Sequence, residues 1–73
     1  MTATEEYSTT LRNLRKKRGL TQSQLAYQLG RDYHTIWSWE KGHHRPPSTI
    51  LPILARVLEV DEDQVTPPAQ SEY

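Results

Sequence analysis

The chain has 73 residues, of which 34% are hydrophobic and 25% are charged, and it contains no cysteine. This length fits one small domain with a thin core, because a chain of this size buries only about 60% of the surface that its unfolded form exposes. The lack of cysteine excludes disulfides and thiolate zinc sites, and no apolar run approaches the roughly 18 residues of a membrane span. Residues 1–8 lack the pattern of a signal peptide, so we expect a cytoplasmic protein without membrane association.

The formal net charge of zero conceals an uneven distribution of charge. Residues 11–45 hold eight basic and two acidic residues (net +6), whereas the rest of the chain holds one basic and seven acidic residues (net −6). A basic middle between acidic ends favours a polyanionic partner for one surface. A solvated face of lysine and arginine side chains would give the same count, so charge alone does not show whether this surface binds a polyanion.

A first helix is predicted from the spacing of Tyr7, Leu11 and Leu14, which places them on one face. Thr4 is expected to be its N-cap, and Gly19 is expected to end it. We therefore expect residues 1–5 to be a flexible N-terminus before a single domain that covers residues 6–66.

The second and third helices have clear boundary signals. Thr21 is the predicted N-cap of the second helix, which ends at Gly30, and Asp32 is the predicted N-cap of the third, which ends at Gly42. The stretch "HTIWSWE" in the third segment is rich in residues that favour strands. A lone strand would have no partner in this chain, so we predict a helix there.

A fourth helix is predicted to begin near Ser48, and "DEDQV" adds a short fifth helix before two prolines. Residues 67–73 are expected to be a flexible tail. The fold class is therefore all-α, a compact four- to five-helix domain.

Residues 22–41 have the pattern of a helix-turn-helix unit. Ala26 is a small residue where the two helices would cross, and Gly30 tolerates the positive φ of the turn. Ile36 and Trp39 fall on the inward side of the third helix. The outer side carries His34, Trp37, Ser38 and Lys41.

Several motifs in register resemble the Cro/CI-type (XRE-like) helix-turn-helix DNA-binding domains of phage and bacterial repressors. The resemblance covers roughly residues 7–65. The motifs are Leu11-x-x-Leu14-Arg15, Gly19-Leu20-Thr21-Gln22, Leu25-Ala26, Leu29-Gly30, Ile36 and Glu40-x-Gly42.

The resemblance implies a lambda-repressor-like fold that binds double-stranded DNA as a homodimer, with the third helix in the major groove. It implies base reading by Tyr33, His34, Trp37 and Ser38. It implies contacts to the DNA backbone from Gln22, Lys41, His43 and Arg45. It also implies a structural salt bridge between Arg15 and Glu40. Because rings occupy several reading positions, no operator sequence can be transferred.

Alternatives remain at two of the reading positions. Trp37 either lies along its own helix or offers an apolar edge to DNA, and Tyr33 either packs or aims its hydroxyl at DNA. His43 is expected to contact phosphate, and His44 is expected to be in solvent. No cysteine or nearby carboxylate completes a ligand set with these histidines, so no metal site and no cofactor are predicted.

The fourth helix carries a second apolar stripe of Ile50, Ile53 and Val57, outside the stripe that its core contacts need. We interpret it as a dimer contact, although a terminal segment could also cover it. Glu59 stands where the family often has glycine after this helix, so the helix is expected to run somewhat further.

These patterns predict a sequence-specific DNA-binding transcriptional regulator, in particular a repressor, acting at the bacterial nucleoid or in a phage-infected cell. The alternative is a protein-interaction module on the same scaffold, for example an antitoxin-like one. No nucleophile with a base, no phosphate loop and no metal set supports an enzyme, and no small-molecule ligand is evident.

Overall fold

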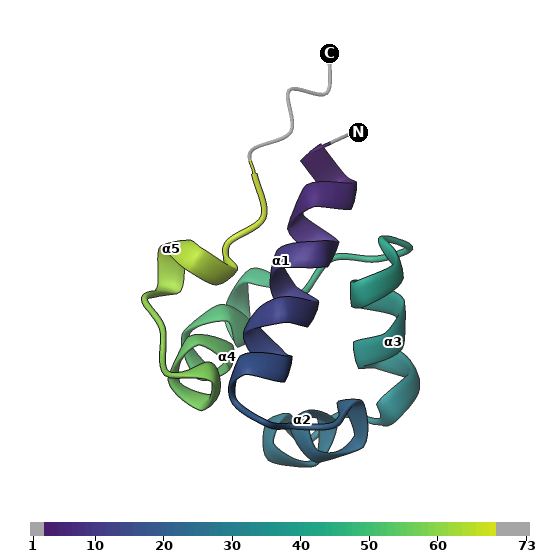
Figure 1. The fold of residues 1–73 in the computed structure, drawn as a ribbon, viewed down its shortest axis with the longest axis vertical. Coiled ribbons are helices and arrows are strands. Elements are labelled where there is room, and N and C mark those ends of the chain that lie inside the picture. Colours follow the sequence, from purple (N-terminus) through teal and green to yellow (C-terminus); the bar gives the residue numbers. More distant parts are fainter. Residues whose placement is uncertain (1–2, 69–73) are drawn as a thin grey trace.

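The computed structural model describes residues 3–68, and it describes their side chains from residue 6 onward. The described elements are α1 (Ala3–Lys17), α2 (Gln22–Leu29), α3 (Tyr33–Lys41), the 3-10 turn η1 (Ser48–Ile50), α4 (Leu51–Leu58) and α5 (Glu62–Val65) (Figure 1). No residue between 3 and 68 belongs to a strand, so the all-α prediction is confirmed.

The first helix begins earlier than the sequence predicts. Because α1 already includes Ala3, Thr4 lies inside the helix, and its prediction as the N-cap is wrong. The helix also reaches three residues into the segment predicted as a flexible N-terminus. Residues 1–2 and most of the predicted tail, residues 69–73, lie outside the described residues.

The ends of α2 and α3 follow from local chemistry. Thr21 and Gln24 form a capping box, in which the Thr21 hydroxyl accepts from the Gln24 N–H at 3.0 Å and the Gln24 side chain accepts from the Thr21 N–H at 2.8 Å. Asp32 caps α3 by accepting from the Thr35 N–H at 3.1 Å. Gly30 and Gly42 end the two helices with φ of 69° and 80°, a conformation that glycine adopts without a Cβ penalty.

The end of α4 differs from the prediction. The helix stops at Leu58, and Glu59 itself takes the left-handed conformation with φ of 60° and ψ of 47°. The Val60 N–H then donates to the Ala55 carbonyl at 3.0 Å and closes the turn. Leu58 before this turn and Val65 on the following helix α5 (Glu62–Val65) are both buried in the core, so tertiary packing overrides the preference of a glutamate for extending the helix.

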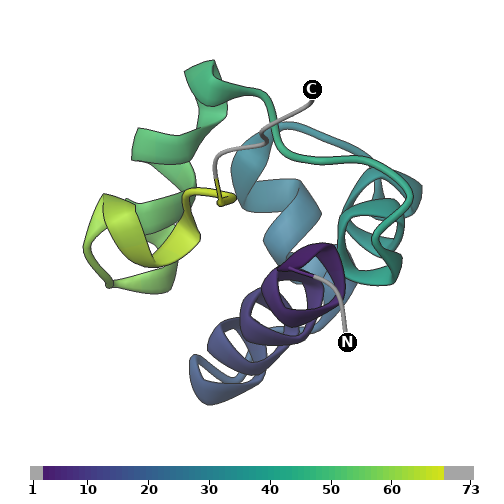
Figure 2. The ribbon, with the colours of Figure 1, turned by 90° about the horizontal axis from the view of Figure 1, so that it is seen from above.

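The helices surround one hydrophobic core. α1 lies between α3 on one side and α4 with α5 on the other, and α2 crosses the end of this arrangement (Figures 1 and 2). The fully buried side chains at its centre are Leu11, Leu25, Ile36, Leu54, Leu58 and Val65. None of the helices in the described part of the chain is long and apolar enough to cross a lipid bilayer.

Tyr7 joins the first helix to the last. Its hydroxyl donates to the Val65 carbonyl at 2.6 Å, across most of the length of the sequence. Burial raises the pKa of Tyr7 to about 12, and the nearby Arg45 charge opposes this only in part. The neutral phenol is therefore the form that holds α5 against α1.

Candidate nucleic-acid interface

The α2–turn–α3 unit has the inward face that the sequence predicts. Leu25 and Ala26 of α2 are buried, and so are Ile36 and Trp39 of α3. The side chain of Trp39 therefore serves packing. The opposite face of α3 is turned outward, with Tyr33, His34 and Lys41 exposed, and it defines the surface that the helix offers to a partner.

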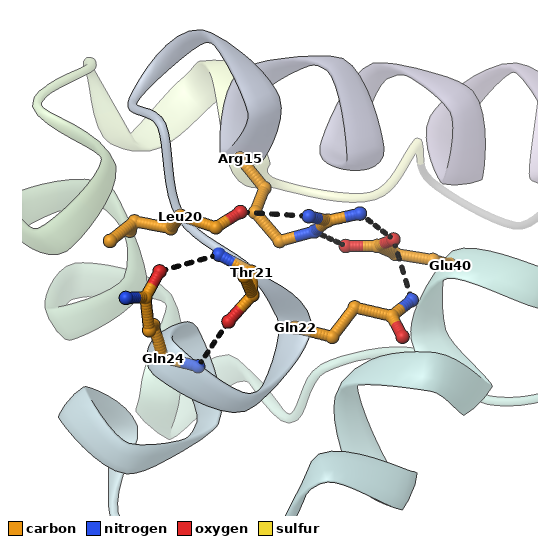
Figure 3. A network of polar contacts seen from close by, with 6 residues as sticks. All are labelled: Arg15, Leu20, Thr21, Gln22, Gln24 and Glu40. Carbon is orange, nitrogen blue, oxygen red and sulfur yellow. Dashed lines mark hydrogen bonds and ion pairs between the residues drawn. The ribbon is translucent and has the colours of Figure 1, made fainter.

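A polar network fixes the position of α3 relative to α1 and α2 (Figure 3). Arg15 Nε lies 2.7 Å from Glu40 Oε2, and Arg15 Nη2 donates to Glu40 Oε1 at 3.0 Å, so the ion pair is bidentate. The two side chains are only 9% and 3% exposed. The third contact of the guanidinium is from Nη1 to the Leu20 carbonyl at 2.8 Å. The implied salt bridge is thus present, and it joins helices that are far apart in sequence.

Gln22 extends the network into the first turn of α2. Its side-chain nitrogen donates to Glu40 Oε1 at 3.0 Å, so one of its two amide hydrogens is already used within the protein. The second amide hydrogen of Gln22 and the first two N–H groups of the helix are the donors offered to an anion, since the third N–H, that of Gln24, donates to Thr21. Gln22 therefore positions α3 in addition to any contact with DNA.

A polar hollow of about 320 Å³ lies where α1, α2 and α3 meet. It is lined by Arg12, Arg15, Gln22, Trp37, Glu40 and Lys41. Because Arg15 and Glu40 neutralise each other, Arg12 and Lys41 supply the unpaired positive charge of the lining. The site-residue predictions did not include Arg12, although it lies three residues before Arg15 and hence on the same face of a helix.

The outer face of α3 carries a stack of three rings. The centroids of His34 and Trp37 are 5.0 Å apart with their planes inclined by 13°, and those of Trp37 and His43 are 5.4 Å apart with an inclination of 15°. Trp37 is half-buried, and both imidazoles are exposed. The indole of Trp37 thus packs between two imidazoles, and its contact with DNA stays a prediction.

Ser38 does not face outward, and the prediction of base reading from an exposed hydroxyl is wrong. The residue is only 8% exposed, and its Oγ lies 2.6 Å from His44 Nδ1. The chain after Gly42 turns back at this point, where the His43 N–H donates to the Ser38 carbonyl at 3.0 Å, and His44 follows directly. His44, expected simply in solvent, is therefore exposed but also bonded to Ser38.

Arg45 is not among the residues that line the polar hollow with Lys41. Its Nη1 donates to the Pro68 carbonyl at 3.2 Å, and its charge acts on Tyr7. The half-buried guanidinium thus contacts the segment after α5, where it joins the loop after α3 to the end of the described chain.

The second apolar stripe of the fourth helix is less exposed than predicted. Ile50 is 3% exposed and belongs to the core, so its prediction as a dimer contact is wrong. It lies in the 3-10 turn η1, which has about 3.0 residues per turn instead of 3.6 and so changes the direction of its side chain. Val57 is half-buried against the core, and Ile53 is 42% exposed.

Among the residues that the structure describes, no group of three or more His, Cys, Asp or Glu side chains is placed to hold a metal ion.

Comparison with known proteins places this arrangement in a family. A family model described as a helix-turn-helix domain matches residues 6–67. The chain is 33% identical over 58 residues to the uncharacterized HTH-type transcriptional regulator YazB of Bacillus subtilis (strain 168), and the match covers 80% of this chain and 84% of that protein.

Solved structures agree with this placement. The restriction-modification controller protein C.AhdI from Aeromonas hydrophila matches with a TM-score of 0.78 and 25% identity, over 86% of this chain and 91% of that one. Hydroxypropylphosphonic acid epoxidase from S. wedmorenis matches with a TM-score of 0.78 and 29% identity, over 99% of this chain but 39% of that one. The likeness to the epoxidase is thus to a minor part of that enzyme. The match over residues 6–67 shows that the chain belongs to the helix-turn-helix domain family.

Proposed function

We propose that this protein is a transcriptional regulator that binds double-stranded DNA by inserting α3 into the major groove. The observation that carries the proposal is the arrangement of α3: its inner face is locked by Ile36, Trp39 and the Arg15–Glu40 pair, and its outer face lies beside Arg12 and Lys41. A rigid helix with a basic border is the geometry that major-groove recognition requires.

The relatives support the same class of function. YazB is described as a transcriptional regulator, and C.AhdI is described as a restriction-modification controller protein. Both matches span at least 80% of this chain and of its relative, so the likeness covers most of this domain and most of theirs. The epoxidase gives no ground for enzymatic activity here, because this chain corresponds to 39% of that chain.

We assign the DNA contacts in two groups. Tyr33 and His34, exposed on the outer face of α3, are the candidates for contacts to base edges. Lys41, Arg12 and the first turn of α2 with Gln22 are the candidates for contacts to phosphate. Contacts of the second group set affinity and its salt dependence, whereas contacts of the first set sequence preference.

We further propose that the protein acts as a homodimer on two half-sites about 34 Å apart, one turn of the double helix. Ile53 on the exposed side of α4 supports a self-contact there, with Val57 next to it on the same helix. Repression as the regulatory outcome is inferred from the resemblance to repressors alone.

The test is selection of binding sites from a pool of random duplexes. The proposal expects enrichment of one short sequence in two symmetric copies and retardation of that duplex that weakens steeply with salt. Retardation without sequence preference, or no retardation at low salt, would contradict the proposal.

One observation favours a second candidate, a protein-interaction module. Tyr27 is 86% exposed on α2, beside a hollow of about 460 Å³ that is lined by Leu20, Ser23, Gln24, Tyr27 and Gln28. An aromatic side chain at a shallow, uncharged hollow suits a protein partner. This candidate predicts that Tyr27→Ala abolishes partner binding and leaves retardation of DNA unchanged.

A further inference from the structure

The ring stack of His34, Trp37 and His43 joins two parts of the chain that a helix end separates. His34 and Trp37 are three residues apart on α3, so their rings lie on the same side of the helix. His43 follows Gly42, whose φ of 80° turns the chain. The N–H of His43 donates to the Ser38 carbonyl at 3.0 Å. The turn thus places the second imidazole over the indole, at a centroid distance of 5.4 Å.

An indole between two imidazoles can stabilise the protonated form of either imidazole. Histidine is the side chain whose charge ordinarily changes near neutral pH, and an imidazolium within about 6 Å of an indole centroid is attracted by the ring face. The two imidazoles lie 5.0 Å and 5.4 Å from Trp37, nearly parallel to it. The indole can therefore stabilise a positive charge on either exposed ring without a carboxylate partner.

The charged side chains around the stack determine whether positive charge on the imidazoles is favourable. Trp37 shares its hollow with Arg12 and Lys41, which are positive, and with the Arg15–Glu40 pair, which is neutral as a unit. The hollow beside His34 contains Asp32 and His44. Asp32 already accepts from the Thr35 N–H and hydroxyl as the cap of α3.

Further positive charge on the stack is repelled by Arg12 and Lys41, and a polyanion on this surface would remove that repulsion. Protonation of the two imidazoles and the binding of a polyanion therefore favour each other, and the coupling is reciprocal.

We propose that His34, Trp37 and His43 form a contact element in which DNA binding is coupled to protonation. The two imidazoles take up protons from solvent when duplex DNA binds, and the indole holds the two imidazole rings in place. This inference rests on the proposed DNA-binding function. Trp37 is then a positioning residue, and His43 acts together with His34 instead of as a separate backbone contact. Because DNA favours the charged imidazoles, affinity is highest at low pH and is lost as the pH rises through the histidine range.

The test in the bound state is the affinity for a mixed-sequence duplex at constant ionic strength between about pH 6 and pH 8. The wild-type affinity is expected to fall about tenfold or more across this range, and the double variant His34→Gln/His43→Gln is expected to change by less than about twofold. The control is His44→Asn, whose side chain can keep a bond to Ser38 and lies outside the stack, and it is expected to keep the wild-type pH dependence. A wild-type affinity that does not change with pH, or a double variant with the wild-type slope, overturns the inference.

A measurement on the free protein separates this inference from the proposed function. The ring-current field of the indole shifts the NMR signals of the imidazole C–H groups of His34 and His43, and Trp37→Leu is expected to remove these shifts while His44 keeps its own. Unchanged imidazole shifts in Trp37→Leu would show that the stack does not form and would overturn the inference without any use of DNA. Failure to bind duplex at every pH, with the shifts present, would instead contradict the proposed function and with it the coupling to DNA.

Discussion

Arg15 and Glu40, which are 25 residues apart in the sequence, form a buried bidentate ion pair with nitrogen–oxygen distances of 2.7 Å and 3.0 Å. The pair holds the outer helix of the candidate interface against α1, and Gln22 adds the first turn of α2 to the same carboxylate. The position of α3 thus depends on one carboxylate that accepts from two helices.

We predict that Glu40→Gln destabilises the fold by about 2–4 kcal/mol, because it leaves the buried Arg15 guanidinium without a counterion. The measurement is the midpoint of urea unfolding. The matched control is Glu59→Gln, which removes the same charge from the exposed pair with Arg18 at 3.5 Å and is expected to cost less than about 1 kcal/mol. Equal losses in the two variants would refute the role of the buried pair.

Arg12 is expected to contact phosphate from the polar hollow beside Trp37 and Lys41. Arg12→Gln should weaken binding to all duplex sequences by a similar factor and reduce the slope of log affinity against log salt by about one. Arg56→Gln, which removes the same charge from the exposed side of α4, is the control and should leave the slope unchanged. A changed order of preferred sequences in Arg12→Gln would instead indicate base reading.

Tyr7 is expected to make stability depend on pH in the alkaline range. Its pKa rises from 10.0 in the unfolded chain to about 12 in the fold. The free energy of unfolding is therefore unaffected by this group below pH 10, and it falls by about 2 kcal/mol as the pH rises from about 10 to 12, because the unfolded chain loses the proton first.

The difference between wild type and Tyr7→Phe isolates this effect. The variant should be less stable by about 0.5–1.5 kcal/mol at neutral pH, since it loses the bond to the Val65 carbonyl. The difference should shrink or reverse above about pH 10. Tyr27→Phe, at an exposed position, should follow the wild type throughout, and a constant difference for Tyr7→Phe across this range would contradict the prediction.

The boundaries of α2 and α3 and the inner face of α3 could be predicted because their causes are local. A cap depends on a side chain three residues from the N–H it satisfies, as for Thr21 and Asp32, and the helical period places Ile36 and Trp39 on one side. Glu40 could be predicted as the partner of Arg15 only from the resemblance to the helix-turn-helix family, since no local rule joins residues 15 and 40.

The features that could not be predicted from the sequence depend on the path of the loops between helices. The bond between Ser38 and His44 and the stack of Trp37 on His43 both need the fold of the chain after Gly42. Ile50 turned inward because its segment is a 3-10 turn, and no residue type in "PPSTI" distinguishes that turn from the start of an α-helix.

Ile53 is the exposed apolar side chain on which the proposed dimer contact depends. Ile53→Lys is expected to shift the dimer toward monomer at low protein concentration, as measured by sedimentation equilibrium, with little change in stability because the side chain is partly in solvent. Gln28→Lys adds the same charge on α2 and should leave the association unchanged. A variant Ile53→Lys that associates like the wild type would place the dimer contact elsewhere.

Glu59 ends α4 in a conformation that costs a residue with a Cβ about 1–2 kcal/mol. Glu59→Gly should remove this cost, of which the greater entropy of unfolded glycine offsets about 0.5–1 kcal/mol. The net gain of roughly 0.5–1 kcal/mol should raise Tm by several degrees, since about 1 kcal/mol corresponds to 4–8 °C in a domain of this size. Glu59→Ala is the matched control, because it loses the ion pair with Arg18 just as the glycine variant does but keeps the Cβ, and it should give no gain. A glycine variant that melts no higher than the alanine variant would show that the left-handed turn stores no strain.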